Sequence, residues 1–318
     1  EPVPGLARYL TFALKEPEHA RSALGALQTT ADGKRTVVGL GAQLCRTLKL
    51  AAPRQLQAFT APPKAKVQLP ATHGDVWVWL RATQAQDRGA LLARTRELQA
   101  ALGGAFALVE AVDAFKHREG RDLTGYEDGT ENPKGKKALA AAFAPDGSSF
   151  VAVQKWQHRW KKIDAMSEQL RNHAIGRERV SNEELDDAPP SAHIKRTTQE
   201  DFILSDGSQG FNLRRSMPWS DAKNSGLMFA AFGQGNAKGF RGRDSIGKKQ
   251  LVKITHAVKQ QRIRMILLDL QILGHHRRGV FHHLAQLFEQ SLGALTVAVL
   301  RHLANLVEHL LQVVAGDG

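Results

Sequence analysis

Residues 125–133, with the sequence GYEDGTENP, hold the most specific arrangement of chemical groups in this chain. Two glycines enclose the carboxylate of Asp128, and glycine permits a positive φ and a close approach of the main chain to a flat or bulky ligand. Asp128 is then presented from a stiff loop rather than a mobile one. A run rich in Gly, Asp and Asn is also typical of a surface turn, so this stretch alone leaves both interpretations open.

Two later segments carry groups that would complement a carboxylate. His193 follows a Pro-Pro turn in the run SAHIKR. A neutral imidazole is a standard ligand of haem iron, although a lone histidine is more often an ordinary surface or core residue. In the run NLRRSMPW, alternation along a strand places Arg214 and Ser216 on one face and Arg215 on the other. Arginine supplies a permanent positive charge and planar donors, which stabilise developing negative charge.

These three segments follow the order of the motifs of the dye-decolourising peroxidases, and the chain resembles that family, in its bacterial cytoplasmic B-type form, over about residues 8–234. The run GYEDGTENP resembles the Gly-x-x-Asp-Gly signature of the family. The resemblance implies a haem b cofactor (iron protoporphyrin IX), with His193 as the proximal iron ligand. It also implies that Asp128 and Arg214 are the catalytic residues on the distal side.

The resemblance further assigns a set of residues to the walls of the cofactor site. These cofactor-binding candidates are Gly125, Gly129, Arg196, Ser216, Leu227 and Phe229. Lys195 and Arg196 could pair with the haem propionates or could be solvated surface charges. Leu227 and Phe229 share one face of a strand, where they fit an apolar distal wall or an ordinary core equally well.

The elements that must position these groups follow from hydrophobic spacing. Strands are expected at 8–14, 35–40, 75–82, 106–112, 150–156, 211–215 and 226–232, and helices at 16–27, 42–50, 86–102 and 162–173. Trp77 and Trp79 are expected to point together into a core. The order predicts an α+β fold of two ferredoxin-like halves, each an antiparallel sheet covered by helices, as in dimeric α+β barrels. The predicted halves are 1–124 and 125–234, and the second carries the haem site.

A composition break near Gln234 separates a third segment. Residues 235–318 hold 12 Lys and Arg against 5 Asp and Glu, a net charge of +7, whereas the whole chain carries +13. This segment does not match the family, and apolar spacing predicts a basic, His-rich helical tail with helices at 263–273, 280–292 and 296–314. Binding of nucleic acid through the tail is an alternative role, but no recognisable motif or interleaved aromatic residues support it.

Composition describes a soluble globular protein, with 42% hydrophobic and 24% charged residues in 318. No apolar run is long enough for a transmembrane helix, and the first ten residues show no signal peptide. Cys45 is the single cysteine and fits a buried small hydrophobe in a reducing compartment. A cytoplasmic location is therefore expected.

The resemblance implies a peroxidase that reduces hydrogen peroxide and oxidises bulky aromatic or dye-like reductants in one-electron steps, assembled as a homo-oligomer. Four oxidisable side chains either pack in the core or relay electrons: Tyr126, Trp156, Trp160 and Trp219. An alternative keeps the haem without turnover, in a haem-binding, haem-delivery or iron-releasing protein.

Overall fold

The structure, a computed structural model, describes residues 2–53, 56, 74–82, 88–197 and 211–234, together with the backbone of 250–255. All of them lie in one unit, Glu1–Gln260. The strands are β1 Leu6–Leu14, β2 Thr36–Gly41, β3 Val76–Ala82, β4 Phe106–Phe115, β5 Ser148–Gln157, β6 Leu213–Arg214, β7 Met217–Ser220, β8 Ser225–Gly233 and β9 Gln250–Thr255. The helices are α1 Ala20–Ala26, α2 Ala42–Thr47, α3 Arg88–Leu102, α4 Gly135–Ala142, α5 Trp160–Asp164, α6 Glu168–Ile175 and α7 His193–Thr197, with a 3₁₀ turn at Leu27–Thr29.

The strands form one antiparallel sheet that closes on itself. Its order is β5-β9-β2-β3-β1-β4-β7-β8-β6, and β5 also pairs with β8 along most of its length. Strand β5 therefore bonds to β9 on one edge and β8 on the other, so the sheet has a barrel-like interior. The predicted α+β class, an antiparallel and barrel-like sheet covered by helices, is confirmed. The predicted division into halves at residue 124 stays a prediction.

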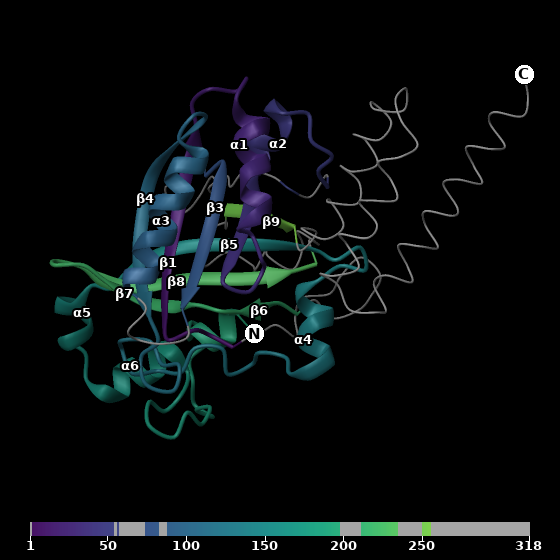
Figure 1. The fold of residues 1–318 in the computed structure, drawn as a ribbon. Coiled ribbons are helices and arrows are strands. Elements are labelled where there is room, and N and C mark those ends of the chain that lie inside the picture. Colours follow the sequence, from purple (N-terminus) through teal and green to yellow (C-terminus); the bar gives the residue numbers. More distant parts are fainter. Residues whose placement is uncertain are drawn as a thin grey trace, which may run out of the picture. The chain divides into compact units, whose positions relative to one another are not determined.

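Strand β3 shows how the two faces of the sheet are used, because all seven of its residues are buried. Val76, Val78 and Leu80 point to the outer face, where they pack with aliphatic side chains of α1 and α3. Helix α3 lies along β1, β3 and β4, and α1 contacts α3 (Figure 1). Trp77 and Trp79 point to the interior instead, where Tyr9 packs against both rings. The prediction that both tryptophans pack in a core is confirmed.

Strand β8 alternates in the same way and sets up the site described below. Met228 and Phe232 belong to the interior core. Leu227 and Phe229, which alternate with them, lie on the outer face and are only partly buried. Cys45, expected to be a small buried side chain, is indeed buried beside Phe150.

Several local predictions were wrong or incomplete. The helix expected over 162–173 is two helices, because Ser167 starts α6 by accepting a hydrogen bond from the Leu170 N–H at 3.2 Å. The strand expected at 211–215 is limited to β6, and helix α4 was not predicted. The segment expected to be a helical tail supplies strand β9, which pairs with β2 and β5. The three helices predicted beyond residue 262 lie outside the described residues.

Candidate active site

Asp128 and Arg214, predicted to work together, are neighbours in the structure. Nη1 of Arg214 lies 3.5 Å from Oδ1 of Asp128, and the two side chains are 20% and 18% exposed. Arg214 comes from β6, where it pairs with Ala231 of β8. Asp128 comes from the loop between β4 and α4. A carboxylate and a guanidinium therefore meet in a half-buried place, where their charges are screened less than on the open surface.

The register of the sheet defines which residues share the face with Arg214. Directly paired residues of antiparallel strands point to the same side, so Arg214 lies on the face of Ala231, the outer one. The same rule adds Gln154, which pairs with Phe229, and Trp156, which pairs with Leu227. The predicted wall residues Leu227 and Phe229 are thus on the face of the guanidinium.

Ser216 follows Arg214 by two residues and is buried at 8% exposure. Its neighbour Met217 belongs to the interior core, so alternation directs Ser216 to the outer face. The Oγ atom of Ser216 and the Nε atom of Arg214 are buried without a hydrogen-bond partner among the described residues. Buried polar groups are ordinarily paired, and these two atoms mark a place where a ligand or water is expected.

Arg215, expected on the other face of the strand, points away from Arg214. Its N–H donates to the Ala230 carbonyl at 2.8 Å. Burial lowers the pKa of Arg215, and the nearby charge of Arg81 lowers that pKa further. Arg81 lies over the ring of Trp79, an interior residue. The two consecutive arginines are therefore divided between the faces of the sheet.

The main chain of Arg214 is held by a side chain from the Asp128 loop. Oδ1 of Asn132 accepts from the Arg214 N–H at 2.8 Å, and Nδ2 of Asn132 donates to the Arg214 carbonyl at 3.0 Å. Gly129 makes this possible. It has a φ of +83°, and a Cβ at Gly129 would lie 2.4 Å from Nδ2 of Asn132.

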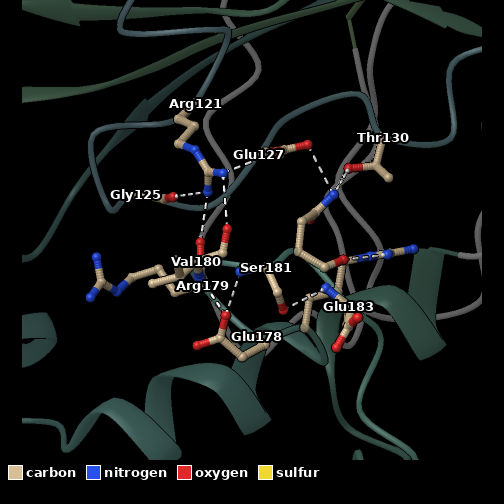
Figure 2. Close-up of polar contacts among 11 residues, drawn as sticks. Arg121, Gly125, Glu127, Thr130, Glu178, Arg179, Val180, Ser181 and Glu183 are labelled. Atoms are coloured by element: carbon tan, nitrogen blue, oxygen red, sulfur yellow. Dashed lines mark hydrogen bonds and ion pairs between the residues drawn. The ribbon is translucent and has the colours of Figure 1, made fainter.

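The first part of the loop is tied to residues 177–184 through Arg121, as Figure 2 shows. Arg121 donates to three backbone carbonyls, those of Gly125 at 2.8 Å, Arg179 at 2.6 Å and Val180 at 3.3 Å. It also donates to the Glu127 carboxylate at 2.9 Å. Gly125 has a φ of +94°, and a Cβ there would meet the Arg179 side chain at 3.2 Å. Gly125 therefore lies close to the Arg179 side chain, and the predicted approach of Gly125 to a ligand stays a prediction.

A second set of bonds fixes the far side of the loop. Asn182 donates to the other oxygen of Glu127 at 2.9 Å and to Oγ1 of Thr130 at 3.1 Å. Arg177 donates to Glu131 at 2.7 Å and to the Asn182 carbonyl at 3.0 Å. Asp128 therefore lies between residues that are each bonded to the 177–184 segment.

His193 is the first residue of α7 and is exposed, as is Arg196. The next residue, Ile194, packs where a Cβ on Gly176 would stand, 2.5 Å from Cγ1 of Ile194. Lys195 pairs with Glu184 at 2.9 Å, so its partner in the structure is a carboxylate of the protein. These contacts connect α7 to the end of α6 and to the 177–184 segment. No role of His193 or Arg196 is tested by them.

A largely buried contact between a histidine and an aspartate lies at the start of the Asp128 loop. Nε2 of His158 is 2.8 Å from Oδ1 of Asp122, and both side chains are largely buried. Burial raises the pKa of the Asp122 carboxyl, but hydrogen bonds from His158 and Thr124 outweigh burial and hold that pKa below its usual value. The Asp122 N–H donates to the Tyr126 carbonyl, and the Gly125 N–H donates to the Asp122 carbonyl.

The four aromatic residues named as possible relays are placed differently. Trp219 and Tyr126 are buried, and Trp156 is 38% exposed. The hydroxyl of Tyr126 donates to Asn172, and the indole of Trp160 donates to Ser225. Trp219 donates to the carbonyl of Trp156 at 2.9 Å. Packing accounts for Trp219 and Tyr126, and electron relay stays a prediction for all four.

Two residues that hold the site were not singled out from the sequence. Asn132 stands inside the motif GYEDGTENP, but its side chain bonds to Arg214, 82 residues along the chain, so the motif gave no signal for this contact. Arg121 gave no signal either, because two of its partners, the carbonyls of Arg179 and Val180, lie far along the chain. Among the described residues, no helix is long and apolar enough to cross a membrane.

Comparisons with known proteins agree with this fold. Residues 119–250 match the sequence-family model described as Dyp-type peroxidase, C-terminal. The dye-decolorizing peroxidase of Rhodococcus erythropolis is 33% identical over 200 residues, which are 59% of this chain and 56% of that protein. The dye-decolorizing peroxidase of Mycolicibacterium paratuberculosis is 30% identical over 227 residues, 69% of this chain and 58% of that protein. This chain thus spans little more than half the length of these relatives.

Solved structures of dye-decolorizing proteins have a similar fold. A dye-decolorizing protein from V. cholerae has a TM-score of 0.69 at 21% identity, covering 82% of this chain and 97% of that one. A variant of DypB from Rhodococcus jostii RHA1 in complex with heme has a TM-score of 0.69 at 24% identity, covering 80% of this chain and 94% of that one. The fold is that of a Dyp-type domain. The chain belongs to the dye-decolourising peroxidase family.

Proposed function

We propose that this protein is a haem peroxidase that reduces hydrogen peroxide and oxidises bulky aromatic or dye-like compounds in one-electron steps. The observation that carries the proposal is the Asp128–Arg214 pair, 3.5 Å apart on the outer face of the sheet, in a chain of this family. A proton carrier and a fixed positive charge are the two groups that cleavage of a peroxide requires.

The residues on this face fit a haem. Leu227 and Phe229 offer partly buried apolar surface beside a buried serine oxygen and an arginine nitrogen that have no partner among the described residues. His193, the exposed first residue of α7, would bind the iron. The remaining candidates are assigned to the propionates and the ring, and these are Arg196, Ser216, Gly125 and Gly129. When bound, haem supplies the one-electron redox chemistry.

Asp128 would move the proton. One carboxylate oxygen would accept a proton from one oxygen of hydrogen peroxide and return it to the other, which would leave as water with the electron pair of the broken O–O bond. The two electrons that this cleavage requires would come from the bound haem. The planar donors of Arg214 face the carboxylate and would stabilise negative charge as it develops on the leaving oxygen. Because Asn132 fixes the main chain of Arg214, the guanidinium needs little reorganisation during this transfer.

The wider predictions extend the same proposal. The reductants would be small aromatic molecules, the chain would form a homo-oligomer, and it would act in the cytoplasm. Haem carriage without turnover and nucleic-acid binding through residues 235–318 are the competing functions. Most of that basic segment lies outside the described residues, and no specific observation favours either function.

Peroxide-dependent oxidation of an aromatic dye by the haem-reconstituted full chain tests the proposal. Asp128→Asn and Arg214→Leu are expected to lower the rate by about 10²- to 10⁴-fold while haem stays bound. The matched control is Asp113→Asn, which removes a different Asp–Arg pair, with Arg8 at 2.6 Å. Its rate should stay within about twofold of the wild type. Equal rates in all four proteins would contradict the assignment of Asp128 and Arg214.

A further inference from the structure

We propose that Asn132 is a positioning residue that holds Arg214 against Asp128, and this inference rests on the function proposed for Arg214. Asn132 would not touch the substrate. It would act by fixing the strand from which the guanidinium projects, so that the charge stays in place beside the carboxylate.

The first argument is the hydrogen-bond pattern of β6. This strand has two residues, and the N–H of the following Arg215 bonds to the Ala230 carbonyl of β8. Successive N–H groups along a strand point to opposite edges. The N–H and carbonyl of Arg214 therefore point away from β8, and the amide of Asn132 meets them at 2.8 and 3.0 Å. The Asn132 side chain therefore makes the two main-chain hydrogen bonds that a neighbouring strand would otherwise make.

The second argument is that one turn supplies both contacts to Arg214. The Asn132 N–H donates to the Gly129 carbonyl at 2.9 Å, which closes a turn directly after Asp128. Gly129 lacks the Cβ that would collide with the Asn132 amide. The guanidinium of Arg214 thus meets Asp128 before the turn, and its main chain meets Asn132 at the end of the turn. The spacing of these residues sets the distance between carboxylate and guanidinium.

The third argument is chemical. Among side chains that fit this space, an amide offers one acceptor and one donor in the geometry that a peptide group requires. Aspartate keeps the acceptor and loses the donor, and alanine loses both. The Arg214 carbonyl also accepts from Nη1 of Arg215 at 2.9 Å. The Arg214 N–H, which donates to Asn132, is therefore the cleaner probe of the contact.

Hydrogen exchange of the Arg214 amide, measured by NMR on the full chain without haem, tests the contact independently of activity. In Asn132→Ala the amide should exchange at least about tenfold faster, because its acceptor is gone. In Asn132→Asp, which keeps the acceptor and remains informative if the alanine variant does not fold, exchange should stay within about threefold. The control Asn224→Ala, which removes an exposed amide bonded to Gln157, should leave the rate unchanged. Unchanged exchange in Asn132→Ala would overturn the proposal.

A double-mutant cycle on the peroxide reaction then tests whether Asn132 acts through Arg214. Asn132→Ala should slow the reaction about tenfold in the wild type and less than about twofold in Arg214→Leu, because the group that it positions is absent there. An equal loss in both backgrounds would show a general structural effect and would overturn the proposal. If Arg214→Leu itself left the rate unchanged, the function proposed for Arg214 would fail, and the exchange result would still decide whether Asn132 holds the strand.

Discussion

The loop that carries Asp128 and the helix that carries His193 are held in very different ways, although both are expected to face the same cofactor. Between Arg121 and Asn132 the loop is bonded at both ends, to the 177–184 segment and to β6. Its Asp128 and the facing Arg214 are half-buried. Helix α7 has five residues, begins at an exposed His193, and is anchored through Ile194 and Lys195.

The difference in how the loop and helix α7 are held matches the chemistry expected of each, which is proton transfer at Asp128 and iron binding at His193. A proton transfer depends on distances of a few tenths of an ångström, so its groups gain from a rigid frame that is built before the substrate arrives. A histidine that binds iron is oriented by the metal bond itself as well as by its protein contacts. We therefore expect the Asp128 side to be set by the protein alone and the His193 side to be completed by the cofactor.

The largest effect should come from the side completed by the cofactor. His193→Gly is expected to weaken haem binding by more than about 100-fold, since the iron loses its proposed protein ligand. Added imidazole should restore much of the binding. Haem titration followed by absorbance measures this. The control His173→Gly removes a nearby histidine that pairs with Asp187 at 3.2 Å, and equal weakening in both variants would remove His193 from the site.

Loss of the Arg121 network should be the next largest effect. Arg121→Met leaves three backbone carbonyls and Glu127 without a guanidinium, and it should lower the free energy of unfolding by about 3 kcal/mol. Urea denaturation of the protein without haem measures this. Arg35→Met is the control, because Arg35 forms a surface pair at 3.6 Å and its loss should cost under about 1 kcal/mol. Similar losses in the free energy of unfolding for the two variants would contradict the claim that Arg121 holds the loop in place before haem binds.

A smaller cost is expected at the turn. Gly129→Ala places a Cβ against Asn132 at a φ of +83° and should lower the free energy of unfolding by about 2 kcal/mol. Gly104→Ala is matched, because a Cβ at Gly104 meets nothing within 4 Å. Denaturation midpoints of the two variants give the comparison. A Gly129 variant as stable as the Gly104 variant would show that the turn tolerates a wider geometry.

The smallest effect depends on pH. The folded-state pKa of Asp122 is held below its usual value by His158 and Thr124 despite burial, so its contribution to stability is present above the unfolded pKa of about 3.9. It is lost as pH falls through the lower folded-state pKa. Asp122→Asn should cost about 1 kcal/mol near neutral pH. The difference in Tm between variant and wild type should shrink below about pH 4, and a constant difference would contradict this origin.

How much the sequence revealed depends on whether a contact is local. Strand alternation identified Trp77 and Trp79 as core residues, and it separated Arg214 from Arg215, because side-chain direction follows from neighbouring positions. The motif GYEDGTENP located the loop, because its glycines and turn-forming residues are neighbours in the sequence. The break between α5 and α6 was missed, since the apolar spacing runs on through Ser167 and only the cap stops it.

The contacts that hold the site could not be predicted in this way. Arg121 bonds to Arg179 and Val180, and Asn132 bonds to Arg214, and each of these pairs forms only once the sheet and the 177–184 segment have come together. Strand β9 was missed because residues near 250 are basic and lie past the composition break, where its pairing with β2 and β5 leaves no periodic trace.

The central claim, that Asp128 and Arg214 form a site for peroxide beside a haem, is tested most directly by rapid mixing. The haem-reconstituted chain is mixed with an equimolar amount of hydrogen peroxide while the Soret band is recorded, and an aromatic reductant is then added. We predict a shift of the band that the reductant reverses, and a shift at least about 100-fold slower in Asp128→Asn. A bound haem whose Soret band does not respond to peroxide would contradict the claim and would favour haem carriage.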